Sequence, residues 1–177
     1  MDAPLENTRS STRRIGWLVL ICLFATFAAG VAHFSNDLPD RVATHFGANG
    51  RPNGWMPRHQ YRNFTLAIGI GTPVFIVATF AIIVRLNGWG LNIPHKTYWL
   101  DPARRRATFE FVERQGFWLA GLLVVFHGAI FLDILLANAR SPVALPTAHF
   151  LTVIGGFVAA IAAWATILIL RFRRPAG

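Results

Sequence analysis

The sequence predicts an all-α membrane protein built from four transmembrane helices. Hydrophobic residues make up 54% of its 177 residues and charged residues only 14%, whereas soluble domains carry about 25% charged residues. Four apolar runs are each long enough to cross a hydrocarbon core, which takes about 20 helical residues. These runs cover residues 15–34, 64–84, 117–137 and 150–170, and they predict a single membrane domain over residues 1–177.

The first apolar run has features of both a cleaved signal peptide and a retained anchor. Arg13 and Arg14 precede it, and small residues lie near its end. The run is longer than a usual signal core and three further spans follow, which favours a retained signal-anchor. The single cysteine, Cys22, excludes an intrachain disulfide and is expected to be a small apolar core residue.

The positions of the basic residues predict the orientation of the spans. Three Lys or Arg residues precede the first run, six separate the second from the third, and three follow the fourth, making twelve against five in the two other loops. The cytoplasmic side of a membrane protein carries this excess. We therefore expect both termini in the cytoplasm, with residues 35–63 outside.

The net charge of +9 also raises the possibility of a nucleic-acid-binding protein. The basic residues lie at the ends of the apolar runs and form no single stripe, as a phosphate-binding surface would require. The charge therefore predicts a lipid bilayer as partner and no nucleic acid.

Small residues inside the spans predict close contacts between helices. In the fourth span, Gly155, Ala159 and Ala163 recur every four residues, with Gly156 and Ala160 beside them. Such a row lets helix backbones approach closely, and it could meet a neighbour in the chain, a membrane protein partner or a second copy. In the second span, Pro73 predicts a kink.

Two ionisable residues interrupt the third span. His127 lies at its middle, where a polar group needs a partner; we expect a hydrogen bond to another helix, for example to Thr72 or Thr79, or a proton or ligand site. Asp133 lies about one turn from the outer end and is expected to reach the interface.

The outer loop, "LPDRVATHFGANGRPNGW", predicts an ordered lid between the first two spans. Asn49-Gly50 and Asn53-Gly54 are both strong turn dipeptides, and Pro52 fixes a dihedral angle between them. Two tight turns would form a small hairpin or folded cap; the alternative is a plain solvated turn. In the inner loop, Asp101-Pro102 predicts the start of a helix that continues into the third span.

Together the two loops resemble a known family. The outer loop resembles the signature of a bacterial membrane domain of unknown function found at the start of SdpI-type immunity proteins, which protect a cell from a secreted sporulation-delaying toxin peptide. The matching outer residues are Pro39, Thr44, His45, Phe46, Gly50, Pro52, Gly54 and Trp55. The inner "NIPHKTYWL" resembles a second motif of short relatives, carried by Asn92, Pro94, Lys96, Tyr98 and Trp99.

The resemblance implies a non-enzymatic multi-pass protein of the bacterial cytoplasmic (inner) membrane, which recognises a secreted peptide or an envelope stress signal at its outer face. The chain departs from the immunity proteins in two ways: they continue into further membrane segments, and Arg58 stands about where a lysine is usual. The alternatives are a small transporter or channel component that uses Pro73 and His127, and an accessory subunit of a membrane enzyme, with the two polar loops as its working parts.

No enzyme motif supports a catalytic function. The sequence has no glycine-rich phosphate loop, no Gly-x-Ser-x-Gly and no His-Glu-x-x-His. Four histidines, His33, His45, His59 and His149, fall near the outer face with Asp37, Asp40 and Asp133, but their spacing matches no dense metal motif. We therefore expect no cofactor and no metal, with an outer zinc site as the alternative.

Overall fold

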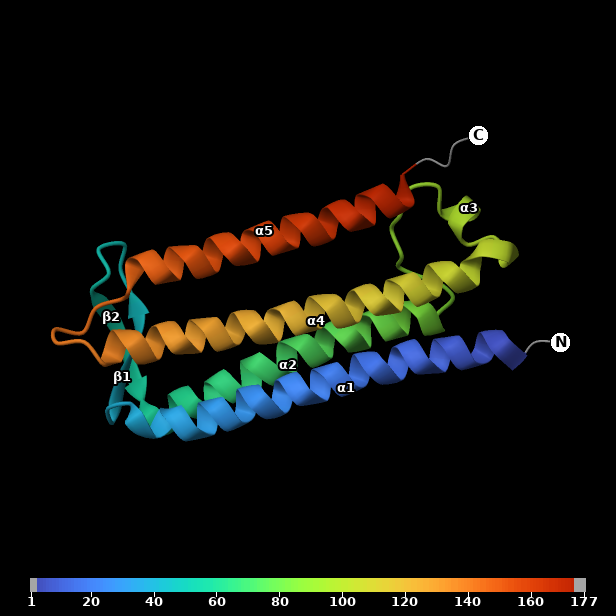
Figure 1. Cartoon of the computed structure of the whole chain (residues 1–177). Coiled ribbons are helices and arrows are strands. Elements are labelled where there is room, and N and C mark those ends of the chain that lie inside the picture. Colours follow the sequence, from blue (N-terminus) through green and yellow to red (C-terminus); the bar gives the residue numbers. More distant parts are fainter. Residues whose placement is uncertain (1–2, 174–177) are drawn as a thin grey trace.

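The computed structural model describes residues 3–173, with side chains from residue 13 onward. Four long helices dominate it (Figure 1): α1 (Ala3–Phe34), α2 (Arg58–Arg85), α4 (Pro102–Asn138) and α5 (Thr147–Phe172). Each is long and apolar enough to cross a membrane. The predicted apolar runs lie inside these helices, so the prediction of a multi-pass helical membrane protein is confirmed.

The shorter elements lie at the two ends of the helix bundle. A 3-10 turn, η1 (Ser35–Asp37), and two strands, β1 (Arg41–Phe46) and β2 (Pro52–Pro57), connect α1 to α2 at one end. A one-turn helix, α3 (Lys96–Trp99), lies between α2 and α4 at the other end, where both termini are found (Figure 1). The two strands pair, so the fold is all-α apart from a small hairpin.

The start of α4 follows the sequence prediction. Asp101 is the N-cap residue, and its Oδ1 accepts a hydrogen bond from the Ala103 backbone N–H at 3.0 Å. Pro102, which has no N–H to satisfy, takes the first helical position. The helix then runs without a break through Gly116 into the third apolar run, so the predicted long helix is confirmed.

Helices α1, α2 and α4 pack together, and α5 lies along α4 (Figure 1). One buried cluster joins α1, α2 and α4 with the hairpin and includes Phe27, Val31, Val42, Tyr61 and Phe131. Gly69 on α2 permits close packing on α1, because a Cβ at that position would overlap the Phe27 ring. The core of the bundle therefore extends into the hairpin.

The structure corrects the expectation for Cys22 and bears on the neighbour expected for the small-residue row of α5. Cys22 is exposed on α1 rather than part of a core, because its face of the helix points away from the bundle. On α5, a Cβ added at Gly155 or Gly156 would meet no described atom within 4 Å, and Ala159 is exposed. Within the described chain, the small-residue row therefore packs against no neighbouring helix except through half-buried Ala160.

Candidate functional site

The outer signature motif folds as an antiparallel hairpin. Arg41 pairs with Pro57 at its base and Phe46 with Pro52 at its tip. Between the strands, the Gly50 N–H donates to the Gly47 carbonyl at 2.9 Å, and Gly50 has φ +72°. Only glycine adopts this left-handed conformation without strain. The turn expected at Asn49-Gly50 is therefore present.

The prediction of a second turn, at Asn53-Gly54, is wrong. Both residues lie within β2, and Gly54 pairs across the sheet with His45. A Cβ at Gly54 would lie 2.9 Å from the His45 Cβ. This glycine therefore makes room for the cross-strand histidine rather than reversing the chain.

The hairpin is fixed to the bundle by its backbone. The Asn138 side chain, in the last turn of α4, accepts from the Ala43 N–H at 2.9 Å and donates to the Ala43 carbonyl at 3.0 Å. It thus occupies the free edge of β1 as a neighbouring strand would. Val42 and Ala43 are fully buried beneath it.

The tip of the hairpin is attached to the segment between α4 and α5. The Leu145 N–H donates to the Gly50 carbonyl at 3.0 Å. A Cβ on Gly50 would lie 3.3 Å from the Thr147 Oγ1, so the glycine also allows this close approach. The hairpin therefore bridges α4 and the start of α5.

Some residues of the hairpin motif are buried and others are exposed. Phe46 packs against the core cluster and Gly50 is buried. Trp55 exposes 44% of its surface, and His45 is exposed beside the Thr44 hydroxyl, 3.1 Å from its Nδ1. Pro39 is also exposed. The hairpin therefore exposes an aromatic ring and an imidazole, with a hydroxyl beside the imidazole, on one fixed strand pair.

A polar cavity of 450 Å³ lies beside the base of the hairpin. Within it, the Arg58 Nη2 lies 2.6 Å from the Asp40 Oδ1, and Nη1 donates to the Asn36 carbonyl at 3.3 Å. His59 and Arg62 also line it and are exposed. Arg58 thus bridges η1, the base of β1 and α2. A lysine ammonium at this position would lack the planar, forked set of donors with which the guanidinium makes these two contacts.

Asp133 does not reach the interface as expected. Its side chain is 1% exposed, and its Oδ1 lies 2.7 Å from the Nδ1 of His149 in the first turn of α5. Its Oδ2 is buried without a hydrogen-bond partner among the described residues. The aspartate therefore pairs α4 with α5 instead of contacting the membrane surface.

The prediction that His127 forms a hydrogen bond to another helix is also wrong. The His127 Nδ1 lies 2.6 Å from the Leu123 carbonyl of its own helix. Thr72 and Thr79 likewise donate to carbonyls one turn earlier in α2, those of Ile68 and Phe75. A side chain that can satisfy itself within its own helix needs no interhelical partner.

The inner motif joins the start of α4 to the end of α5. The Trp99 carbonyl accepts from the Thr108 hydroxyl at 3.0 Å, and the Arg171 guanidinium lies 4.4 Å from the centre of the Trp99 ring. The Arg104 guanidinium lies 4.0 Å from the Tyr98 ring. Asn92, Pro94 and Lys96 are exposed. The two motifs are therefore at opposite ends of the molecule and form separate sites.

The outer histidines do not converge on a metal site. Over residues 13–173, whose side chains the structure describes, no three His, Cys, Asp or Glu side chains come close enough to hold a metal ion. Sequence reasoning missed the contacts of Asn138, Leu145 and Arg171. A polar amide at the end of an apolar run was the only local signal for Asn138, and nothing in the sequence indicated its partner.

Comparison with protein families gives one result. Residues 21–68 match the family model of a domain of unknown function, DUF1648. The match covers the second half of α1, the whole hairpin and the start of α2, and thus the outer motif with the polar cavity beside it. No curated protein and no solved structure matches the chain.

Proposed function

We propose that this chain is a non-enzymatic protein of the bacterial cytoplasmic membrane that recognises a secreted peptide or an envelope stress signal with its outer hairpin, as the resemblance to SdpI-type immunity proteins implies. The observation that carries the proposal is that the hairpin is fixed to the bundle and still exposes two of its large side chains. Val42 and Ala43 are buried and Asn138 holds the strand edge, while His45 and Trp55 are presented. A surface held in this way can bind without a large ordering cost.

The chemistry of the presented residues suits a peptide. Trp55 offers a large apolar surface at low conformational cost, and tryptophan is enriched among residues that dominate binding energies. His45 and Thr44 add hydrogen-bonding groups next to it. The polar cavity at the same end adds the guanidinium of Arg62 beside the Arg58–Asp40 pair.

A survival assay tests the immunity function. Sensitive cells that express the chain are challenged with the sporulation-delaying toxin peptide, and survival is compared between the wild type, Trp55→Ala and Trp89→Ala. Trp89 is the matched control, because it is 75% exposed at the opposite end of the molecule. We expect protection by the wild type and Trp89→Ala and its loss in Trp55→Ala; no protection by the wild type would refute immunity.

Recognition at the outer face is tested separately by photo-crosslinking. A benzophenone side chain at position 45 or 55 is expected to capture an extracellular peptide or envelope component in living cells, whereas the same group at position 89 is not. Capture from position 89 alone would exclude the hairpin as the recognition surface.

A further inference from the structure

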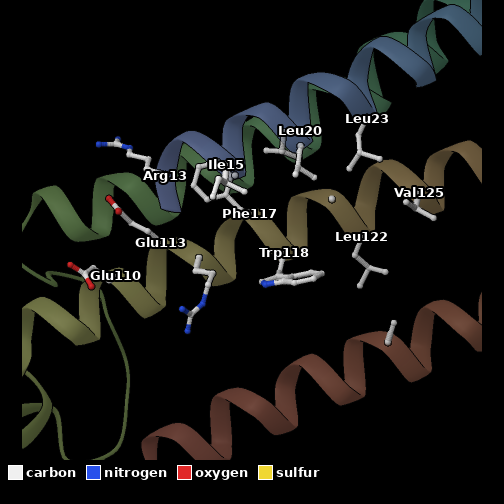
Figure 2. A pocket seen from close by; sticks show the side chains of 15 residues that line it. Arg13, Ile15, Leu20, Leu23, Glu110, Glu113, Phe117, Trp118, Leu122 and Val125 are labelled. Carbon is white, nitrogen blue, oxygen red and sulfur yellow. The ribbon is translucent and has the colours of Figure 1, made fainter. Parts of the chain in front are cut away.

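A cavity of 680 Å³ lies between α1, α4 and α5, towards the end of the molecule that carries both termini (Figure 2). Its volume is in the usual range for small-molecule sites, about 300–1,000 Å³. The walls are apolar over most of their length, with Leu20 and Leu23 from α1, Trp118, Leu122 and Val125 from α4, and Ala160 from α5.

The cavity opens sideways onto the surface that would face lipid. Val19, Trp118 and Val125, which line it, expose 54%, 68% and 59% of their surfaces. Arg114, Trp118 and Leu122 follow one another at intervals of four residues and so form one row along α4. A molecule in the membrane could enter this space without crossing the bundle.

Charged residues stand only at one end of the cavity. Arg13, Glu110 and Glu113 line that end (Figure 2), and Arg114 belongs to the same lining. Glu110 is paired with Arg106, whose Nε lies 3.1 Å from its Oε1. Around this end, in residues 13–14, 85–114 and 171–173, ten Lys or Arg side chains face three Asp or Glu side chains. The lining of this end holds two arginines and two glutamates, so the basic excess around it is what favours an occupant with an anionic head and an apolar body.

The length of the cavity matches one leaflet of a membrane. Arg114 and Val125 are eleven residues apart, which is about 16 Å along a helix, and half of a hydrocarbon core is about 15 Å. The space is therefore long enough for an acyl chain of one leaflet.

We propose that this cavity is a binding site for an anionic membrane phospholipid. One of its two acyl chains lies along Leu20, Trp118 and Leu122, and its phosphate lies at Arg13 and Arg114. Basic pockets between transmembrane helices are known to hold anionic headgroups. The lipid would fill the space between α4 and α5 and so stabilise the position of α5.

Lipid titration followed by native mass spectrometry tests the proposal. The purified, delipidated full chain is titrated in detergent with phosphatidylglycerol or phosphatidylcholine. We expect one phosphatidylglycerol per chain, bound more tightly than phosphatidylcholine. Arg114→Gln should weaken the binding of phosphatidylglycerol about five-fold, which is the effect of one basic residue near an anionic headgroup. Arg105→Gln, an exposed arginine outside the cavity, should leave the affinity unchanged.

A second pair of variants tests the apolar part. Ala160→Leu places a larger side chain in the cavity and should weaken the binding of both lipids. Ala163 is exposed on the same helix and lies outside the cavity, so Ala163→Leu should leave the binding unchanged. Size-exclusion chromatography and circular dichroism establish that each variant folds.

Two results would overturn the proposal. One is equal affinity for the two lipids together with no effect of Arg114→Gln, which would show that the charged end selects nothing. The other is occupation by a second copy: the delipidated chain would then be a dimer, and Leu122→Cys in a Cys22→Ser background would crosslink between copies.

Discussion

Asn138 illustrates how one side chain can determine the position of a functional surface. Its amide makes two hydrogen bonds with the backbone of Ala43 and a third, as donor, with the Ile134 carbonyl at 2.9 Å. Because Ala43 is fully buried, its N–H and carbonyl have no access to water. Only a side chain that carries both a donor and an acceptor satisfies them.

Asn138→Ala is expected to lower the free energy of unfolding by about 2–3 kcal/mol, because two buried backbone groups lose their partners. Thermal unfolding in detergent measures the change, and hydrogen exchange at Ala43 should accelerate. Asn53→Ala is the control, because Asn53 is exposed in the same hairpin. Unchanged exchange at Ala43 in Asn138→Ala would mean that the amide does not hold the strand.

The Asp133–His149 pair makes an asymmetric prediction. His149→Ala leaves a buried carboxylate without its partner and should cost about 1–3 kcal/mol of unfolding free energy. Asp133→Asn removes the charge together with the pairing, while the histidine, whose side chain is 44% exposed, can bind water. Asp133→Asn should therefore be the milder change in the same unfolding assay; the reverse order would contradict a paired carboxylate.

For helices and strands, the sequence predicted a feature correctly where neighbouring residues alone determine that feature. Asp101 and Pro102 begin α4 because capping involves only the neighbouring backbone. Asn53-Gly54 carries the same kind of turn signal as Asn49-Gly50, yet it lies in a strand because His45 from the other strand occupies the space beside Gly54. His127 found its partner within one turn, which the sequence could not distinguish from a distant threonine.

Packing between α1 and α2 provides a matched pair of glycine variants. Gly69→Ala should destabilise the chain by about 1–3 kcal/mol, because the new methyl group would overlap Phe27, which is itself buried in the core. Gly71→Ala, two residues further on, would meet no described atom within 4 Å. It should be neutral or stabilise the helix by up to about 1 kcal/mol. Unfolding in detergent distinguishes the two, and equal effects would contradict this helix contact.

For the whole molecule, hydropathy was sufficient to predict the four helices, and composition was sufficient to predict the membrane. Contacts between distant segments could not be predicted. Asp133 and His149 lie on different helices, as do Trp99 and Arg171. In each pair, the sequence around one residue does not indicate which distant residue it contacts. The hairpin, the Asp133–His149 pair and the Trp99–Arg171 contact fix α5 at its two ends, while the proposed lipid lies between them.

The charge distribution makes a prediction about the whole molecule that labelling can test. With twelve basic residues on the side of the termini and five on the side of the hairpin, the hairpin should face outwards. In a Cys22→Ser background, Asn53→Cys should react with a membrane-impermeant maleimide in intact cells. Arg105→Cys, exposed at the opposite end, should react only after lysis. The opposite labelling pattern would place the hairpin in the cytoplasm, and an extracellular peptide could then not be its ligand.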